Sequence, residues 1–360
     1  MNDRDRYVAT ILGQPVDRPP FWLMWSPWAT TWQRWEREGK PTEITDHRSF
    51  MNPDVLPMVV NVNTGPSPKL DTQPIEEDED FYTFYDTWGI KRRNYKHGES
   101  MSEFLEFPVK DRASWAAYRD RYLNPDDPAR LADDWLEPAR AWYNQGYPLQ
   151  LGYYPDGGVF GPYRWLMGDE AGLVALMDMP DLAHEIMDHI TSLYLTVWEP
   201  VAKVLQISVI HLWEDMCYVG GPLISPRMWN EFLGPNYRRI KAFAVQHNIP
   251  VISVDTDGQP DRIARPMIDG GVNELFPLEV AAGCDVNEWQ RKYPELAYMG
   301  GIDKRVLAQG KAAIDRELAR IAPAVLRGRY IPDLDHLVPD DVSWENYLYY
   351  AQSLKKLVGA

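Results

Sequence analysis

Acidic side chains recur where the β-strand-like runs in the second half of the sequence end. Glu214 ends one such run, and Asp255 and Asp257 follow the next run in a turn that closes at Gly258. Neighbouring carboxylates repel one another unless they share a cation or protons. Because Asp255 and Asp257 lie two residues apart, both can point at one ion, and His336 would complete a three-ligand metal site with an open position. The alternative is that these acids cap helices and pair with nearby basic side chains.

Aromatic side chains supply a second set of candidate contacts, in a chain with 15 Trp and 20 Tyr. Trp25 and Tyr153 stand at the ends of predicted strands, where they would line a pocket for a flat, apolar ligand. Trp28 follows Trp25 in the same loop, although its helical spacing to later tryptophans also fits packing. Trp88 lies in a segment that we expect to cover the site. We therefore include all four among the substrate-binding residues.

Two basic residues complete the predicted substrate site. Lys304 directly follows Asp303 at a strand end, and Arg164 follows the predicted strand at 149–154. Each would bind an anionic group or pair with an acid. The glycine-rich stretch 157–161 lacks the Lys-Ser/Thr of a phosphate-binding loop and the spacing of a dinucleotide fingerprint. We expect no nucleotide cofactor.

The elements that would position these residues alternate between strand and helix. Short apolar runs, each followed by a helical pattern, occur at 149–154, 207–213, 251–254, 272–276, 296–303 and 330–332. Such a series predicts a parallel sheet with helices outside it. Residues 21–25 and 59–62 would bring the strands to eight. We therefore predict an α/β fold, a single (β/α)₈ TIM barrel over residues 1–360 with an N-terminal helix, whose chemistry sits on the loops after the strands.

One segment interrupts this alternation. Residues 81–109 include Phe84-Tyr85-Asp86-Thr87-Trp88-Gly89-Ile90-Lys91-Arg92, which is typical of a β-hairpin excursion. We expect it to lie over the barrel mouth and to form part of a lid or substrate wall.

Composition excludes several classes of function. Apolar residues make up 45% and charged residues 25% of the chain, which is typical of a globular protein. The formal net charge of −16 disfavours binding to nucleic acid or to anionic membranes. Two cysteines, Cys217 and Cys284, are too few for a disulfide framework, and the N-terminus lacks the apolar core of a signal peptide. We expect a cytoplasmic protein without a membrane span, and a homodimer stays open.

Several motifs, in order along the chain, resemble the uroporphyrinogen decarboxylase superfamily. The opening Gly13-Gln14-Pro15-Val16-Asp17-Arg18-Pro19-Pro20 matches its turn before the first barrel strand. Later matches are Glu214-Asp215-Met216, Glu274-Leu275-Phe276-Pro277-Leu278-Glu279, Gly300-Gly301-Ile302-Asp303-Lys304-Arg305 and Tyr330-Ile331-Pro332 with His336-Leu337-Val338-Pro339. The resemblance covers nearly the whole chain and implies one (β/α)₈ barrel.

The sequence departs from both branches of that superfamily. The decarboxylases carry arginines after the first strand, where this chain has Met24-Trp25-Ser26-Pro27-Trp28. The methylcobamide-dependent methyltransferases hold zinc with one His and two Cys, and the resemblance places Asp255, Asp257 and His336 at those positions. Two carboxylates and one imidazole suit a divalent ion, zinc foremost, that polarises an oxygen more readily than it ionises a thiol.

These observations lead to three hypotheses. The first is a metal-dependent methyltransferase that moves a methyl group between a small aromatic or methoxylated substrate and a corrinoid protein, with Glu214, Asp255 and Asp257 as catalytic residues. The second is a decarboxylase of a small acid or a uroporphyrinogen-like substrate, whose carboxylate would bind to Arg92, Arg93 or Arg164. The third is a ligand-binding barrel without catalytic activity.

Overall fold

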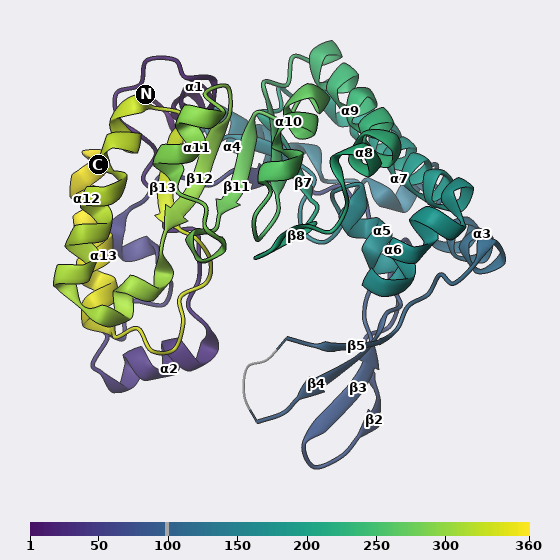
Figure 1. Ribbon diagram of the computed structural model, residues 1–360, viewed down its shortest axis with the longest axis horizontal. Coiled ribbons are helices and arrows are strands. Elements are labelled where there is room, and N and C mark those ends of the chain that lie inside the picture. The colour runs from purple at the N-terminus through teal and green to yellow at the C-terminus, as the bar shows by residue number, and fades with distance from the viewer. Residues whose placement is uncertain (98–100) are drawn as a thin grey trace.

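A curled parallel sheet of seven strands forms the centre of the protein (Figure 1). The computed structural model describes residues 1–97 and 101–360. The strands lie in the order β1 (Met58–Val59), β6 (Leu149–Leu151), β7 (Val209–Trp213), β10 (Val251–Asp255), β11 (Glu274–Leu278), β12 (Ala297–Ile302) and β13 (Tyr330–Leu334). Each pair is parallel, so all the carboxyl ends lie at one edge of the sheet. The α/β class and the six predicted strands from residue 149 onward are confirmed, and β1 overlaps the predicted strand at 59–62 only at Val59.

Helices cover the outside of this sheet. They are α1 (Asp3–Leu12), α2 (Ala29–Arg37), α3 (Arg112–Tyr122), α4 (Leu136–Asn144), α5 (Phe160–Met167), α6 (Asp169–Asp178), α7 (Pro180–Ala202), α8 (Pro226–Met228), α9 (Gly234–Gln246), α10 (Asp261–Gly270), α11 (Val286–Lys292), α12 (Lys311–Arg327) and α13 (Trp344–Val358). Sequence signals fix several boundaries. Ser225 caps α8 by accepting a hydrogen bond from the Met228 amide, and Pro226 takes the first helical position, where no amide donor is required.

The predicted first barrel strand is not a strand. Residues 21–25 run beside β13, but their amides bond to side chains: Phe21 N donates to Asp54 and Met24 N donates to Asp333, each at 2.7 Å. One isolated bridge, between Pro27 and Val338, continues this neighbourhood. Because carboxylates replace the strand carbonyls as acceptors, no ladder forms, and β1 and β13 stay the unpaired edges of the described sheet. A closed eight-stranded barrel is therefore not confirmed.

Helix α1 lies across the amino ends of the strands. Tyr7 and Ile11, one helical turn apart, enter a small apolar cluster with the inward side chains of the sheet, including Val251 and Ile331. The cluster fills the lower part of the space inside the curled sheet. The N-terminal helix predicted from the sequence is thus the floor of that space.

The excursion is larger than the predicted hairpin. It is an antiparallel sheet of four strands, β2 (Pro74–Glu77), β3 (Phe81–Tyr85), β4 (Lys91–Tyr95) and β5 (Glu103–Glu106), and it stands out from the body on the side of the carboxyl ends (Figure 1). The turn between β3 and β4 is its inner end, because Trp88 and Ile90 are buried there. A short hairpin, β8 (Cys217–Tyr218) and β9 (Gly221–Pro222), follows β7.

Candidate functional site

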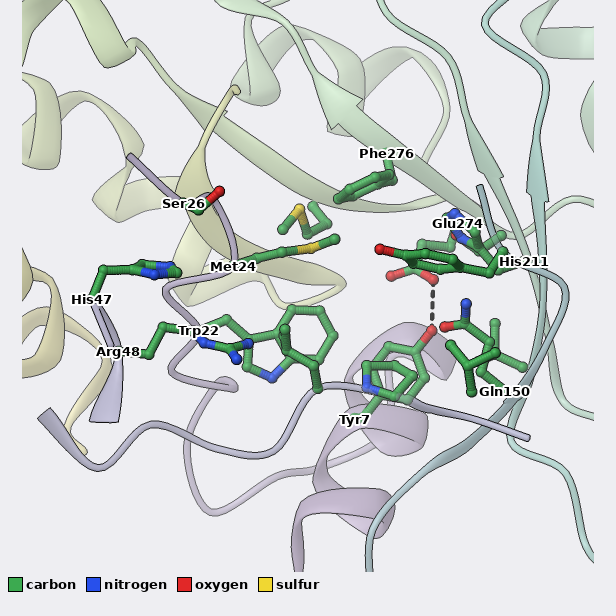
Figure 2. A pocket seen from close by; sticks show the side chains of 17 residues that line it. Tyr7, Trp22, Met24, Ser26, His47, Arg48, Gln150, His211, Glu274 and Phe276 are labelled. Carbon is green, nitrogen blue, oxygen red and sulfur yellow. Dashed lines mark hydrogen bonds between the residues drawn. The ribbon is translucent and has the colours of Figure 1, made fainter. Parts of the chain in front are cut away.

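A cavity of about 430 Å³ lies inside the curled sheet, on the side that the seven strands leave unpaired. We call it the barrel cavity. Its walls come from six of the parallel strands and from the segments that cross the unpaired side. They are Tyr7, Trp22, Met24, Ser26, His47, Arg48, Leu56, Pro57, Val59, Gln150, Tyr153, Val209, His211, Ser253, Glu274, Phe276 and Met299. Figure 2 shows Glu274, His211 and Gln150 at one end, His47 and Arg48 at the other, and Trp22 and Met24 between them.

Strand register builds the polar end of the cavity. His211 on β7 pairs with Ser253 on β10, and Ser253 pairs with Glu274 on β11, so the three side chains point to the same face. His211 Nδ1 lies 3.4 Å from Ser253 Oγ. Tyr7 reaches up from α1 and donates its hydroxyl to Glu274 Oε2 at 2.7 Å. Burial raises the pKa of Glu274, and the hydrogen bonds from Tyr7 and Ser253 oppose that rise.

Two acid–imidazole pairs stand at the carboxyl ends of the strands. His211 Nε2 lies 3.8 Å from Asp255 Oδ2, and His336 Nε2 lies 3.9 Å from Asp257 Oδ2. Burial, followed by the nearby charges of Asp255 and other acids, raises the pKa of Asp257 to about 8. Burial and then the charge of Lys304 lower the pKa of His336 to about 4. At neutral pH the second pair is therefore a protonated acid beside a neutral imidazole.

The predicted metal ligands fall into these separate pairs. Asp255 faces His211, whereas Asp257 faces His336. Among residues 1–97 and 101–360, no three His, Cys, Asp or Glu side chains are grouped closely enough to hold a metal ion. The donors as arranged do not fit a three-ligand ion, and the metal stays a prediction.

Trp25 contacts one wall residue of the barrel cavity, Phe276, and one wall residue of a second hollow, His336. Its ring stacks on Phe276, with centroids 5.4 Å apart, and on His336, with centroids 4.5 Å apart. The second hollow, of about 500 Å³, has Trp28, Lys304 and His336 in its walls, and we call it the mouth cavity. Three predicted substrate contacts, Trp25, Trp28 and Lys304, are thus brought together.

Glu214 lies elsewhere. It is fully buried and accepts hydrogen bonds from the amides of Val159, Phe160 and Gly161 at the start of α5, and from the Tyr237 hydroxyl at 2.6 Å. A Cβ on Gly161 would overlap the carbonyl oxygen at the end of β7, so glycine permits this close approach. With its oxygens occupied, Glu214 positions α5 and lines neither cavity. Its predicted catalytic role stays untested.

The remaining predicted contacts scatter. Tyr153 is 53% exposed and lines the barrel cavity. Trp88 is buried in the core, where its Nε1 donates to Asp156 at 2.8 Å, and no wall residue of the two cavities comes from the described part of the excursion. The described part of the excursion therefore does not form the lid or substrate wall that the sequence predicts.

The arginines chosen for the decarboxylase hypothesis have acidic partners. Arg92 binds Asp86 at 2.7 Å, and Arg93 binds Glu103 at 2.5 Å. Arg164 bonds to Asp169 at 2.6 Å and to both the carbonyl and the carboxylate of Asp215. This agrees with the alternative interpretation of the sequence, in which acids at the strand ends pair with basic side chains.

The sequence placed Glu274 at a strand end and His211 within a strand, but sequence reasoning missed Ser253, Tyr7 and Arg48 as residues of the barrel cavity. Ser253 shares one face of β10 with Val251 and Asp255, each two residues away, and this period of two could have placed it inside. Tyr7 shares an apolar helical face with Ile11, so its hydroxyl had to meet a buried partner. No sequence pattern indicated that Arg48 lines the cavity, because it lies in an irregular segment without helical or strand periodicity.

The comparisons with known proteins concern the fold. No family model and no curated protein sequence matches the chain. Among solved structures, a methyltransferase from Methanosarcina mazei is similar over 99% of each chain, with a TM-score of 0.60 and 16% sequence identity. At that identity the likeness is one of fold. No helix among the described residues has the length and apolar character of a membrane span.

Proposed function

We propose that this protein is a methyltransferase that binds a small methylated substrate, such as a methoxylated aromatic compound, in the barrel cavity and exchanges its methyl group with a corrinoid on a separate protein. The observation that carries the proposal is the likeness in fold, along the full length of both chains, to a methyltransferase. The cavity supports it, because its volume and mixed apolar and polar walls suit a compact organic molecule. The corrinoid would supply the cobalt that accepts or releases the methyl group.

The wall of the barrel cavity includes neither Asp257 nor His336, so the proposal requires the methoxy group to point toward the carboxyl ends of the strands, where this pair can supply the proton. A methoxy oxygen that loses its methyl group becomes an anion and must be protonated. Asp257, whose pKa of about 8 keeps it protonated at neutral pH, is the acid, and His336 beside it stays neutral under the same conditions. Trp25 orients the imidazole by stacking on it.

No step of this proposal uses a metal. The expected zinc ligands Asp255, Asp257 and His336 form two pairs with different partners instead of one donor set. Elemental analysis of the purified protein tests the metal directly. About one equivalent that is lost in both Asp255→Ala and His336→Ala would restore the metal hypothesis.

A methyl-transfer assay tests the proposed function. The purified protein is incubated with cob(I)alamin, free or bound to a corrinoid protein, and with a panel of methoxylated and N-methylated compounds. We expect methylcobalamin to form with one class of donor, and Asp257→Asn to lower the rate by about a hundredfold, as is usual for loss of a general acid. Glu43→Gln, an exposed change, serves as the control. Absence of methyl transfer from every donor would contradict the proposal.

Arg48 favours a decarboxylase of a small acid as the second candidate. Its side chain lines the barrel cavity, and its described ion-pair partner, Asp46, is 3.7 Å away. Release of CO₂ from a small acid, lost in Arg48→Gln, would support this candidate. Binding of a ligand without either reaction would favour the non-catalytic barrel.

A further inference from the structure

Glu274 is a carboxylate inside the barrel cavity that forms no ion pair with any residue that the structure describes. Its side chain is 3% exposed, and its hydrogen-bond donors, Tyr7 and Ser253, are both neutral hydroxyl groups. No ion pair joins it to a Lys, Arg or His side chain within residues 1–97 and 101–360. A buried carboxylate without a counter-charge is unfavourable, which is why burial raises the pKa of Glu274. A cation that enters the cavity would stabilise the ionised form of this side chain and would itself be attracted to it.

The nearest imidazole does not fill this role. His211 lies one strand beyond Ser253 in the register, and its Nε2 faces Asp255. His211 is thus shared between two carboxylates: it faces Asp255, and its charge interaction with Glu274 is the smallest of the effects that favour the ionised form of Glu274. The guanidinium of Arg48 stands at the opposite end of the cavity, beyond Trp22 and Met24 (Figure 2).

Aromatic rings surround the space in front of Glu274. Tyr7 and Trp22 pack together on one wall, with ring centroids 5.5 Å apart, and Phe276 and Tyr153 belong to the same lining. Trp25 stacks behind Phe276 and holds that ring in place. Ring faces attract cations, and most strongly where water is excluded. A carboxylate among aromatic rings is the arrangement that recognises alkylated ammonium groups.

We propose that the barrel cavity binds a small organic cation, with an ammonium group carrying methyl substituents placed between Glu274 and the rings of Tyr7, Trp22 and Phe276. The assignment names the substrate class of the proposed methyltransferase and so rests in part on that function. The binding step itself requires only the cavity. The excess of acidic residues in the chain, at a net charge of −16, also draws cations toward the protein.

Three ligands of nearly equal shape but different charge test whether the cavity recognises the positive charge or only the shape of the ligand. They are choline, the neutral 3,3-dimethylbutan-1-ol, in which carbon replaces nitrogen, and the anionic 3,3-dimethylbutanoate. Isothermal titration of the full-length protein measures the affinity for each. We expect choline to bind at least about tenfold more tightly than the neutral analogue, and the anion to bind most weakly. Equal or tighter binding of either analogue, or no binding of choline, would overturn the proposal.

Substitution of the carboxylate locates the contact. Glu274→Gln keeps the size of the side chain and its ability to accept the Tyr7 hydroxyl, so the fold is retained. We expect it to weaken choline by about tenfold and to leave the neutral analogue unchanged, so that the preference disappears. Glu43→Gln, with its exposed side chain, should preserve the preference. If Glu274→Gln unfolds, Phe276→Leu replaces it, with the same expected loss of preference and circular dichroism as the check of folding.

The outcome is separable from that of the proposed function. Glu274-dependent choline binding without any methyl transfer would leave the cation site standing and remove the methyltransferase. Methyl transfer from a neutral methoxylated compound, together with no preference for choline, would support the methyltransferase and contradict the cation site.

Discussion

Buried carboxylates in this protein differ in the donors that surround their oxygen atoms. Glu214 accepts hydrogen bonds from three helix amides and one hydroxyl, whereas Glu274 has two hydroxyl donors and faces a cavity. Asp333 accepts from the amides of Met24 and Leu334 and from Tyr350. The first and third are saturated and hold the fold together. Glu274 has capacity left for a ligand, which is why the binding proposal centres on it.

Glu214→Ala should destabilise the protein severely. Four buried donors, at Val159, Phe160, Gly161 and Tyr237, lose their acceptor together, and we expect the free energy of unfolding to fall by about 3 to 5 kcal/mol. Urea denaturation measures this change. A loss below about 1 kcal/mol, comparable with that of the exposed control Glu43→Ala, would show that the amides find water instead.

Asp333 should make stability fall as pH rises. Burial raises its pKa from 3.8 to about 7, so the folded state holds a proton that the unfolded state has released across this interval. The stability contributed by the protonated form is complete below pH 3.8 and is lost progressively as pH rises toward 7, at up to about 1.4 kcal/mol per pH unit. Asp333→Asn removes this titration, and its unfolding free energy should depend less on pH than that of the parent. Parallel curves for the two proteins between pH 4 and 7 would refute the assignment.

At the scale of elements, helix α1 is joined to the sheet by one polar contact within an apolar interface. Tyr7 bonds to Glu274 on β11, while Ile11 and the ring of Tyr7 pack against the inward side chains. The helix therefore forms the floor of the barrel cavity, and through Tyr7 it also provides one of the hydrogen-bond donors to Glu274.

Tyr7→Phe should loosen this floor. The change leaves a buried carboxylate with one donor fewer, and we expect a loss of about 1 to 3 kcal/mol together with faster amide hydrogen exchange in α1. The matched control is Tyr349→Phe, which removes an exposed hydroxyl bonded to Asp315 and should cost much less. Equal losses in the two variants would mean that the buried bond carries no special weight.

The helices and strands could be predicted from the sequence where a short local pattern of residues determines them. Strands β7, β10 and β13 follow from apolar β-branched runs, and the cap at Ser225 follows from its Ser-Pro pair. Residues 21–25 have a similar run, but the carboxylates of Asp54 and Asp333, distant in sequence, take their amides, and no local pattern contains that information. The candidate site divides in the same way. Asp255, Asp257 and His336 were found from strand ends, whereas the contact between Tyr7 and Glu274 depends on how the helix meets the sheet.

For the whole molecule, the four-stranded excursion has an anchored end and a free end. Trp88, in the β3–β4 turn, is buried against the body and bonds to Asp156, and Tyr118 donates its hydroxyl to the Trp88 carbonyl. The turn between β2 and β3, at residues 78–80, is exposed. We therefore expect the stability of the protein to depend on the β3–β4 end of the excursion and not on the β2–β3 turn.

Two changes test this asymmetry. Trp88→Ala should lower the free energy of unfolding by about 3 to 5 kcal/mol, because a large buried ring and its hydrogen bond are both lost. A short Gly-Ser insertion after Glu79 should change it by less than about 1 kcal/mol. Thermal and urea unfolding of both variants measure the difference, and comparable losses would contradict the anchoring role of Trp88.

The contact between Tyr7 and Glu274 also determines at what stage of protein synthesis the barrel cavity can form. The two residues are 267 positions apart, so during synthesis the helix that carries Tyr7 emerges long before its partner strand. Contacts of such separation close large loops and form slowly. A ribosome-bound chain that ends before residue 274 can hold neither the finished floor nor the carboxylate. Ligand binding therefore begins only when most of the protein has been made, and a ligand present in the cell stabilises the last stage of folding instead of the first.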